Sequence, residues 1–152
     1  MAVLPLRLLP IKYVMATNII QHHELFDFDA FFENIKSQYI GLDYHDYLNF
    51  MHTDGEKHSF IGRAEWKDRV KNALENAIAS DEAVEIINRA SSVIINIIRS
   101  SEAVRPILME EIQYLNEFIT GFSENCNVTW GLSEVSSLGN AVKVIILANV
   151  KD

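Results

Sequence analysis

The sequence has 152 residues, of which 49% are hydrophobic and 22% are charged, and its formal net charge is -8. This length suits one domain with a substantial buried core, and the composition is ordinary for a globular protein. The acidic balance argues against a nucleic-acid partner, because binding a phosphate backbone requires clustered Lys and Arg. No apolar, uncharged stretch reaches about 18 residues, so no membrane-spanning helix is expected. The single cysteine, Cys126, excludes an internal disulfide and fits a reducing, cytoplasmic compartment.

The first 40 residues divide into an apolar arm and a helix-like segment. Residues 1–22 are interpreted as an N-terminal arm or edge strand, because Pro10 limits strand pairing and no small-residue cleavage site of a signal peptide is evident. Residues 23–40 carry apolar side chains at three- and four-residue spacing. This spacing predicts an amphipathic helix that ends near Gly41.

A pair of carboxylates follows this predicted helix. Asp43 and Asp46 lie just before or within a short helix expected over residues 46–52. One interpretation is structural: Asp43 caps the short helix and Asp46 lies in its first turn, where the helix dipole favours an acid. The spacing alone favours this interpretation, because acid pairs at helix starts are common.

From residue 57 onward, strand and helix signals alternate. Ser92–Ile98 is a nearly continuous β-branched run, which is typical of a central strand covered on both faces. The spacing of the last two expected strands favours a hairpin with a long loop. The expected fold is an α/β (α+β) sandwich, in which a four-stranded mixed sheet packs against two helices. The strands are expected over residues 57–65, 92–98, 127–132 and 142–150, and the helices over residues 68–80 and 106–119.

Several segments, taken in order, carry a resemblance to a known family. They are the acid loop Gly41-x-Asp43-x-x-Asp46, the strand Ser59–Ala64, the helix start Asp68-Arg69, the strand Ser92–Ile97 with Asn96, and the strands Asn127–Leu132 and Val142–Ala148. This order resembles the C-terminal half of the bacterial division GTPase FtsZ, a relative of tubulin. The resemblance implies that residues 23–40 are the end of the family's central helix and residues 41–152 its C-terminal domain. By this resemblance, the 152 residues are expected to lack the N-terminal GTPase domain that precedes these segments in the family.

The resemblance also implies a role for the acid pair. In the family, the corresponding loop enters the nucleotide pocket of the next subunit in a filament, where its carboxylates help to position the attacking water. Phosphoryl transfer depends chiefly on positioning and electrostatics, so acids supplied in trans can complete a site. Asp43 and Asp46 would take this catalytic role. The family has an asparagine where this sequence has Gly41, which removes an amide side chain. The expected interaction loop around the acids comprises Gly41, Leu42, Tyr44 and His45.

The sequence leaves two classes of function open. Its six glycines are scattered and no Gly-rich phosphate loop or GxxxxGK[ST] motif occurs, so no complete GTPase and no bound cofactor are expected, and GTP would enter only through a partner subunit. In the first class, the chain is a cap or regulator that offers its acid loop to FtsZ or an FtsZ-like subunit, or assembles with itself. In the second, it is a fold relative used as a dimeric scaffold or small-ligand-binding domain. A third interpretation is a fragment of a larger FtsZ-like GTPase.

The remaining chemically capable residues favour structural interpretations. Cys126 is expected to be a small buried apolar residue, and Trp66 to make a partly exposed contact. Glu110 and Glu111, together with Glu117, are expected on the solvated face of their helix. Three histidines near the acidic residues match no recognised metal-ligand spacing, so no metal site is expected and exposed loop positions are predicted for them. They are His45, His52 and His58.

Overall fold

A five-stranded sheet organises the computed structural model. The structure describes residues 19–22, 26, 42, 44–100, 106–135 and 138–151, so the helix expected over residues 23–40 lies outside the described residues except for Phe26. The described strands are β1 (Ile19–Gln21), β2 (Glu56–Ala64), β3 (Ser92–Ser100), β4 (Asn127–Val135) and β5 (Val142–Val150). The described helices are α3 (Tyr44–His52), α4 (Arg69–Ala77), α5 (Asp81–Arg89) and α6 (Met109–Thr120).

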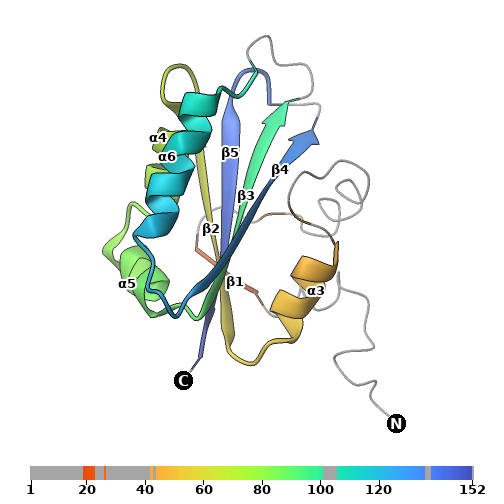
Figure 1. Ribbon diagram of the computed structural model, residues 1–152, viewed down its shortest axis with the longest axis vertical. Coiled ribbons are helices and arrows are strands. Elements are labelled where there is room, and N and C mark those ends of the chain that lie inside the picture. Colours follow the sequence, from red (N-terminus) through yellow and green to blue (C-terminus); the bar gives the residue numbers. More distant parts are fainter. Residues whose placement is uncertain are drawn as a thin grey trace.

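The strand order is β1-β2-β5-β3-β4, and the sheet is mixed (Figure 1). β5 pairs antiparallel with both β2 and β3, whereas β1 is parallel to β2 and β4 is parallel to β3. The α/β class predicted from the sequence is confirmed, with β1 as a strand beyond the expected four. The predicted hairpin between the last two strands is wrong, because β3 lies between β4 and β5. Eight of the nine residues of β5 are buried, which suits the centre of a sheet, whereas β4 is largely half-buried at an edge.

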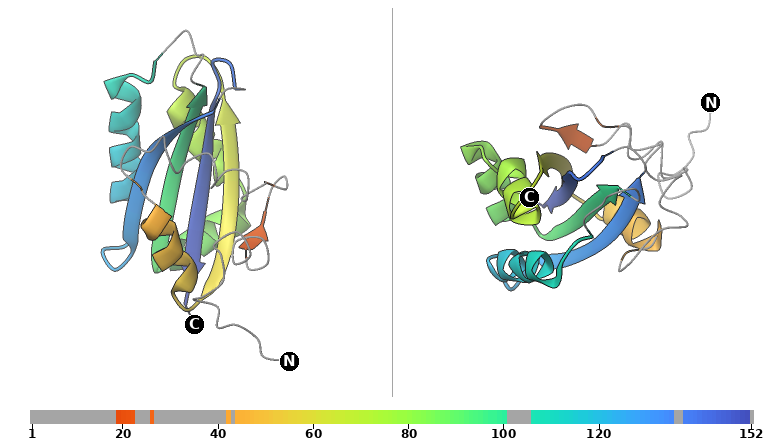
Figure 2. Two further views of the ribbon diagram at one scale, coloured as in Figure 1. Left: turned by 90° about the vertical axis from the view of Figure 1, so that its right-hand side faces the viewer. Right: turned by 90° about the horizontal axis from the view of Figure 1, so that it is seen from above.

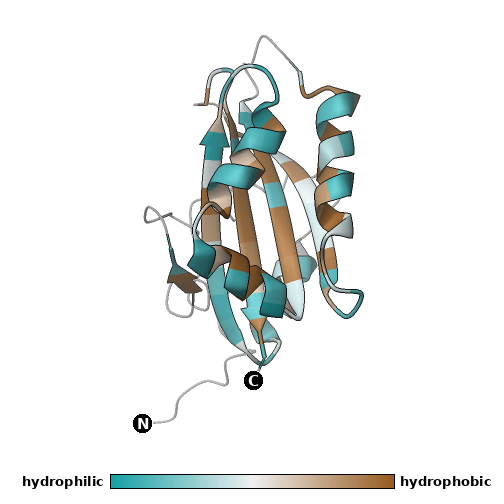
Figure 3. Cartoon of the chain, turned by 90° about the vertical axis from the view of Figure 1, so that its left-hand side faces the viewer, coloured by the Kyte–Doolittle hydropathy of each residue, from teal (hydrophilic) through white to brown (hydrophobic). Residues whose placement is uncertain are grey.

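Helices cover both faces of this sheet unequally (Figures 1 and 2). α4, α5 and α6 lie on one face and enclose the larger hydrophobic cluster, which includes Phe60, Leu74 and Ile146. The hydropathy view shows the apolar side of these helices turned toward apolar strands (Figure 3). On the opposite face, α3 encloses a smaller cluster that includes Phe50 and Ile94. Adjacent β3 residues therefore alternate between two separate cores.

The helix expected over residues 68–80 is α4, which is shorter than expected, and a separate helix, α5, follows it. α4 ends at Ala77, and α5 begins at Asp81 after Ser80, whose side-chain oxygen accepts a hydrogen bond from the Ala83 backbone N–H at 3.0 Å. This N-cap starts a new helix because it satisfies one of the backbone donors that a helix start leaves unpaired. Residues Asp81–Arg89 therefore form a helix of their own, in addition to the two helices expected to pack on the sheet.

α4 approaches β2 very closely, and Gly62 of β2 makes this possible. A Cβ atom added at Gly62 would lie 1.9 Å from the carbonyl oxygen of Ala73 and 2.6 Å from the amide nitrogen of Ala77. Only a residue without a side chain leaves room for the helix backbone here. The small residues Ala73 and Ala77, both fully buried, complete the tight contact.

Candidate functional site

The start of α3 carries the part of the predicted acid loop that the structure describes. Asp46 lies in the first turn of α3 and is half-buried. His45 beside it is exposed, whereas Leu42 is only 2% exposed and packs in the smaller cluster, so its side chain anchors the segment before the helix. Tyr44 is the first residue of α3. Asp43 and Gly41 lie outside the described residues. The in-trans catalytic role of Asp43 and Asp46 and the role of the interaction loop stay predictions.

A buried chain of hydrogen bonds fixes α3 to the sheet. The amide nitrogen of Asn96, in the middle of β3, donates to the Tyr47 hydroxyl at 2.8 Å, and the Ser133 hydroxyl of β4 donates to the Asn96 amide oxygen at 2.9 Å. Tyr47, Asn96 and Ser133 are each no more than 2% exposed. Because buried polar groups are costly without partners, this chain specifies one seating of Tyr47 on the sheet. Asp46, the preceding residue, is held at a defined place as a result.

The other end of α3 is held by a buried lysine. The ammonium group of Lys57 donates to the carbonyl oxygens of Thr53 and Gly55, the latter at 3.1 Å, and lies 5.9 Å from the centre of the Phe50 ring. Burial lowers the pKa of Lys57, and nearby Asp54 partly opposes this effect. Cations near a helix C-terminus are favourable, because the last carbonyl groups carry partial negative charge. Both ends of α3 are therefore fixed.

The histidines do not all lie where the sequence suggested. His45 and His52 lie on α3, the first exposed and the second half-buried, and His58 lies on β2 and is 5% exposed. The predicted loop position is therefore wrong for all three, and the predicted exposure is confirmed for His45 alone. His58 Nδ1 lies 2.6 Å from His22 Nε2, and His58 Nε2 lies 2.6 Å from a carboxylate oxygen of Glu56. Among the residues that the structure describes, no group of three or more His, Cys, Asp or Glu side chains could hold a metal ion.

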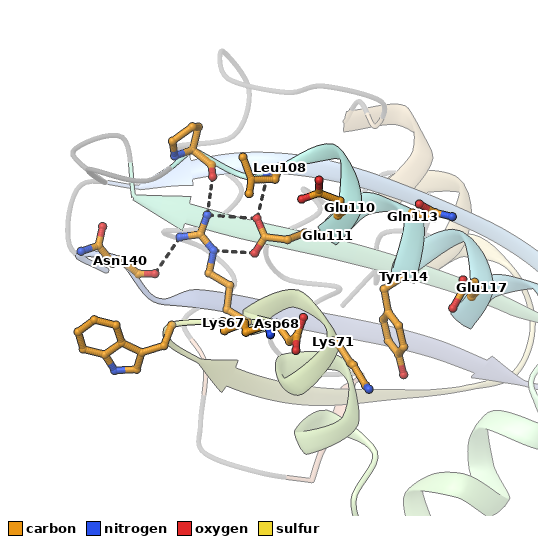
Figure 4. Close-up of a pocket in the computed structure, with 13 residues that line it drawn as sticks. Lys67, Asp68, Lys71, Leu108, Glu110, Glu111, Gln113, Tyr114, Glu117 and Asn140 are labelled. Atoms are coloured by element: carbon orange, nitrogen blue, oxygen red, sulfur yellow. Dashed lines mark hydrogen bonds and ion pairs between the residues drawn. The ribbon is translucent and has the colours of Figure 1, made fainter.

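A concave feature, which we name the α4/α6 cleft, lies between the N-terminal halves of α4 and α6 (Figure 4). Its volume is about 830 Å³. β2 and β3 run in the same direction, so the helices that follow them start at the same edge of the sheet. The residues lining the cleft are Trp66, Lys67, Asp68, Arg69, Lys71, Pro106, Leu108, Glu110, Glu111, Gln113, Tyr114, Glu117 and Asn140.

One buried arginine joins the segments around the α4/α6 cleft. Arg69 Nε donates to a carboxylate oxygen of Glu111 at 2.9 Å, and its terminal nitrogens donate to the carbonyl oxygens of Asn140 at 3.0 Å and Pro106 at 2.7 Å. Glu111 also accepts the Leu108 backbone N–H at 2.7 Å. The prediction of a solvated Glu111 is therefore wrong: its side chain is 13% exposed and Arg69 neutralises it, whereas Glu110 and Glu117 are exposed as predicted.

Cys126 is less buried than the sequence predicted. It is half-buried against the larger cluster, and burial raises the pKa of its thiol. A thiol with a raised pKa is a weak nucleophile near neutral pH, because the thiolate is the reactive form. Trp66 is 75% exposed, more than the partly exposed contact predicted from the sequence.

The positioning roles of Asn96 beside α3 and of Arg69 at the α4/α6 cleft were not predicted, although the sequence carries a signal for each. Asn96 interrupts an otherwise apolar strand, which is typical of a buried residue with specific partners. Arg69 precedes Ala73 and Ala77 at four-residue spacing, which places it on the inward stripe of its helix. Their partners Tyr47 and Glu111 lie far away in sequence, and no local pattern identifies them.

Several solved structures share the fold of this chain. The chain is similar to the W319Y mutant of FtsZ from M. jannaschii, with TM-score 0.58, 20% identity, and coverage of 72% of this chain and 32% of that one. A dimer of M. jannaschii FtsZ gives TM-score 0.57, 20% identity and coverage of 75% and 32%. GDP-bound CetZ1 from Haloferax volcanii gives TM-score 0.52, 15% identity and coverage of 74% and 34%.

These similarities establish the fold of FtsZ and its tubulin-like relatives. The chain spans about a third of the length of each of these structures. No family model matches the sequence, and no curated protein matches it. Among the described residues, no helix has the length and apolar character needed to cross a membrane.

Proposed function

We propose that this chain is an FtsZ-like C-terminal module of a cytoskeletal polymer, in which it acts as a cap or regulator of assembly. It presents the loop with Asp43 and Asp46 to the nucleotide face of FtsZ or an FtsZ-like subunit. The fold supports this proposal. The observation that carries it is the placement of Asp46, in the first turn of a helix that Tyr47 and Asn96 bond to the middle of the sheet.

The proposed task of the acids is to orient a water molecule, and this task suits the placement of Asp46. Carboxylates near the γ-phosphate of a partner's GTP accept hydrogen bonds from the attacking water and orient it. Such a contribution depends on position, since a misplacement of about 1 Å can cost about a hundredfold in rate. A helix held at both ends supplies the required rigidity better than a free loop does.

We also propose that the chain stops filament growth. No Gly-rich phosphate loop occurs in these 152 residues. When these residues occupy a partner's nucleotide face through the acid loop, they offer no phosphate loop of their own to the next subunit. At substoichiometric amounts it would end filaments, while its acids accelerate hydrolysis in the one subunit that it contacts.

GTP turnover and pelleting of FtsZ from the same organism test this proposal. We expect the chain to change both at substoichiometric ratios, and we expect the Asp43→Ala/Asp46→Ala double variant to lose the effect on turnover. The matched control is Glu124→Ala, an exposed acid in the turn before β4. Equal effects of the parent and the double variant would contradict the assigned role of the acids.

A further inference from the structure

The α4/α6 cleft gathers most of the exposed large apolar side chains. Five such residues are exposed in the described part of the chain, and three of them lie at the start of α4 or α6: Trp66 at 75%, Leu108 at 49% and Met109 at 81%. Trp66 and Leu108 line the cleft, and Met109 directly follows Leu108. Large apolar groups clustered on a surface mark association sites, and tryptophan is among the commonest anchors of protein interfaces.

The backbone that displays Trp66 is constrained. Trp66 and Asp68 have φ angles of 68° and 56°, and they are the two residues other than glycine with positive φ in the described part of the chain. Such conformations are unfavourable for residues with a side chain and persist where the surroundings enforce them. Arg69, the residue after Asp68, anchors the end of this segment, since it bonds the carbonyl oxygens of Pro106 and Asn140 as well as Glu111. Trp66 is thus presented from a fixed loop.

Exposed lysines occur only on the α4 side of the α4/α6 cleft, together with the acids Asp68 and Glu75, whereas the exposed charges that line the α6 side are glutamates. Lys67 and Lys71 lie on the α4 side with Asp68, whereas Glu110 and Glu117 lie on the α6 side (Figure 4). All four of these lysines and glutamates are exposed, and no ion pair within the described residues neutralises them. The lysines of one side are therefore complementary to the glutamates of the other.

We propose that a second copy of this chain docks on the α4/α6 cleft to form a two-fold symmetric dimer. The helices run side by side in the same direction, since Arg69 contacts Glu111 near both starts and Glu75 accepts a hydrogen bond from Tyr114 further along. A two-fold axis parallel to the helices places α4 of each copy over α6 of the other. Opposite charges then meet, and the apolar starts of the helices meet at the same end.

A different two-fold axis does not bring together both the opposite charges and the apolar helix starts. A two-fold axis across the helices places α4 over α4, which opposes lysines to lysines and separates the apolar ends. The self-complementary arrangement is closed, because each copy uses the same surface, so it ends at a dimer. This contact differs from a head-to-tail contact through the acid loop, and it does not rest on the function proposed above.

Charge reversal tests the proposal by sedimentation velocity on the full chain. In the α4 variant, Lys67→Glu/Lys71→Glu, both sides of the cleft are acidic. In the α6 variant, Glu110→Lys/Glu117→Lys, both sides are basic. We expect each variant alone to dissociate with a Kd at least about tenfold higher than that of the parent, because like charges then face each other. We expect an equimolar mixture to form a heterodimer, because an acidic cleft then faces a basic one.

An apolar pair of variants gives a second, independent measurement. Trp66→Ser/Met109→Ser should weaken the dimer, whereas the control Ile20→Ser/Val84→Ser removes exposed apolar side chains elsewhere and should not. A parent chain that is monomeric at its highest attainable concentration would overturn the proposal. So would reversal variants that self-associate as the parent does, or a mixture that fails to associate although both variants retain the parent's circular dichroism spectrum.

Discussion

The two faces of the sheet hold their helices by different means. On the face covered by α4, α5 and α6, the interior is apolar, α4 touches β2 at a glycine, and the charged residues Arg69 and Glu111 pair at the edge. On the face covered by α3, a smaller cluster surrounds the hydrogen-bonded residues Tyr47, Asn96 and Ser133. Close packing mainly supplies stability, whereas directional bonds mainly specify position. On the face with the candidate catalytic acid the directional bonds lie inside the hydrophobic cluster, whereas on the α4 face they lie at its edge.

The largest expected loss of stability comes from breaking the buried ion pair on the α4 face. Arg69→Met should lower the free energy of unfolding by about 4 kcal/mol, because it leaves the Glu111 carboxylate largely buried without its cation. The control is Arg63→Met, which removes an exposed pair with Glu65 at 3.8 Å and should change stability by less than about 1 kcal/mol. Chemical denaturation measures both, and equal losses would contradict the special role of Arg69.

Close packing on the same face gives the next largest effect. Gly62→Ala should destabilise the fold by about 3 kcal/mol, because the added methyl group meets the Ala73 carbonyl oxygen, a backbone atom that cannot move aside without shifting α4. Gly121→Ala provides the comparison: its nearest atom is the Phe118 carbonyl oxygen at 3.3 Å, and the change should stay near about 0.5 kcal/mol. Thermal denaturation that ranks the two variants in the opposite order would exclude the close approach at Gly62.

A smaller loss is expected on the α3 face, where position is the main consequence. Tyr47→Phe should cost about 2 kcal/mol, because it leaves the buried Asn96 amide nitrogen without the hydroxyl that accepts its hydrogen bond. Tyr114→Phe removes a hydroxyl that bonds the exposed Glu75 and should cost less than about 1 kcal/mol. Hydrogen exchange should show faster opening of α3 in Tyr47→Phe but unchanged protection in α4. Uniform acceleration across both helices would argue against a local role.

The smallest expected effect is a dependence of stability on pH, which comes from Cys126 beside the larger hydrophobic cluster. Burial raises the pKa of Cys126 above its usual 9.0, so the folded state holds the thiol proton more tightly than the unfolded state does. The stabilising contribution is therefore complete below about pH 9 and is lost as the pH rises through the folded-state pKa. Alkylation by iodoacetamide should reach its half-maximal rate at a higher pH in the folded chain than in denaturant. Coincident pH profiles would contradict the burial effect.

Much of the fold follows from local pattern. The β-branched run Ser92–Ile98 predicted a central strand, and β3 occupies that place in the sheet. The strand over residues 142–150 was predicted with its observed bounds. The partner of that strand could not be predicted locally, because neighbours in a sheet are chosen by burial over the whole domain. The near-complete burial of β5 is the physical reason for its central position.

Less of the candidate site could be predicted. The sequence drew attention to Asp46, because an acid pair precedes a short helix, but the residue that seats this helix is its neighbour Tyr47. The bond from Tyr47 to Asn96 spans 49 positions, and a bond of that range leaves no mark on local periodicity. The α4/α6 cleft depends in the same way on the meeting of Arg69 and Glu111 across 42 positions.

The role of the acid loop is the central claim, and GTP turnover of FtsZ in the presence of this chain tests it most directly. The account predicts that substoichiometric parent chain changes the turnover rate, that Asp43→Ala/Asp46→Ala abolishes the change, and that Glu124→Ala retains it. We also expect the free energy of unfolding of the double variant to equal that of the parent to within about 0.5 kcal/mol. A folded double variant that changes turnover as much as the parent does would contradict the claim.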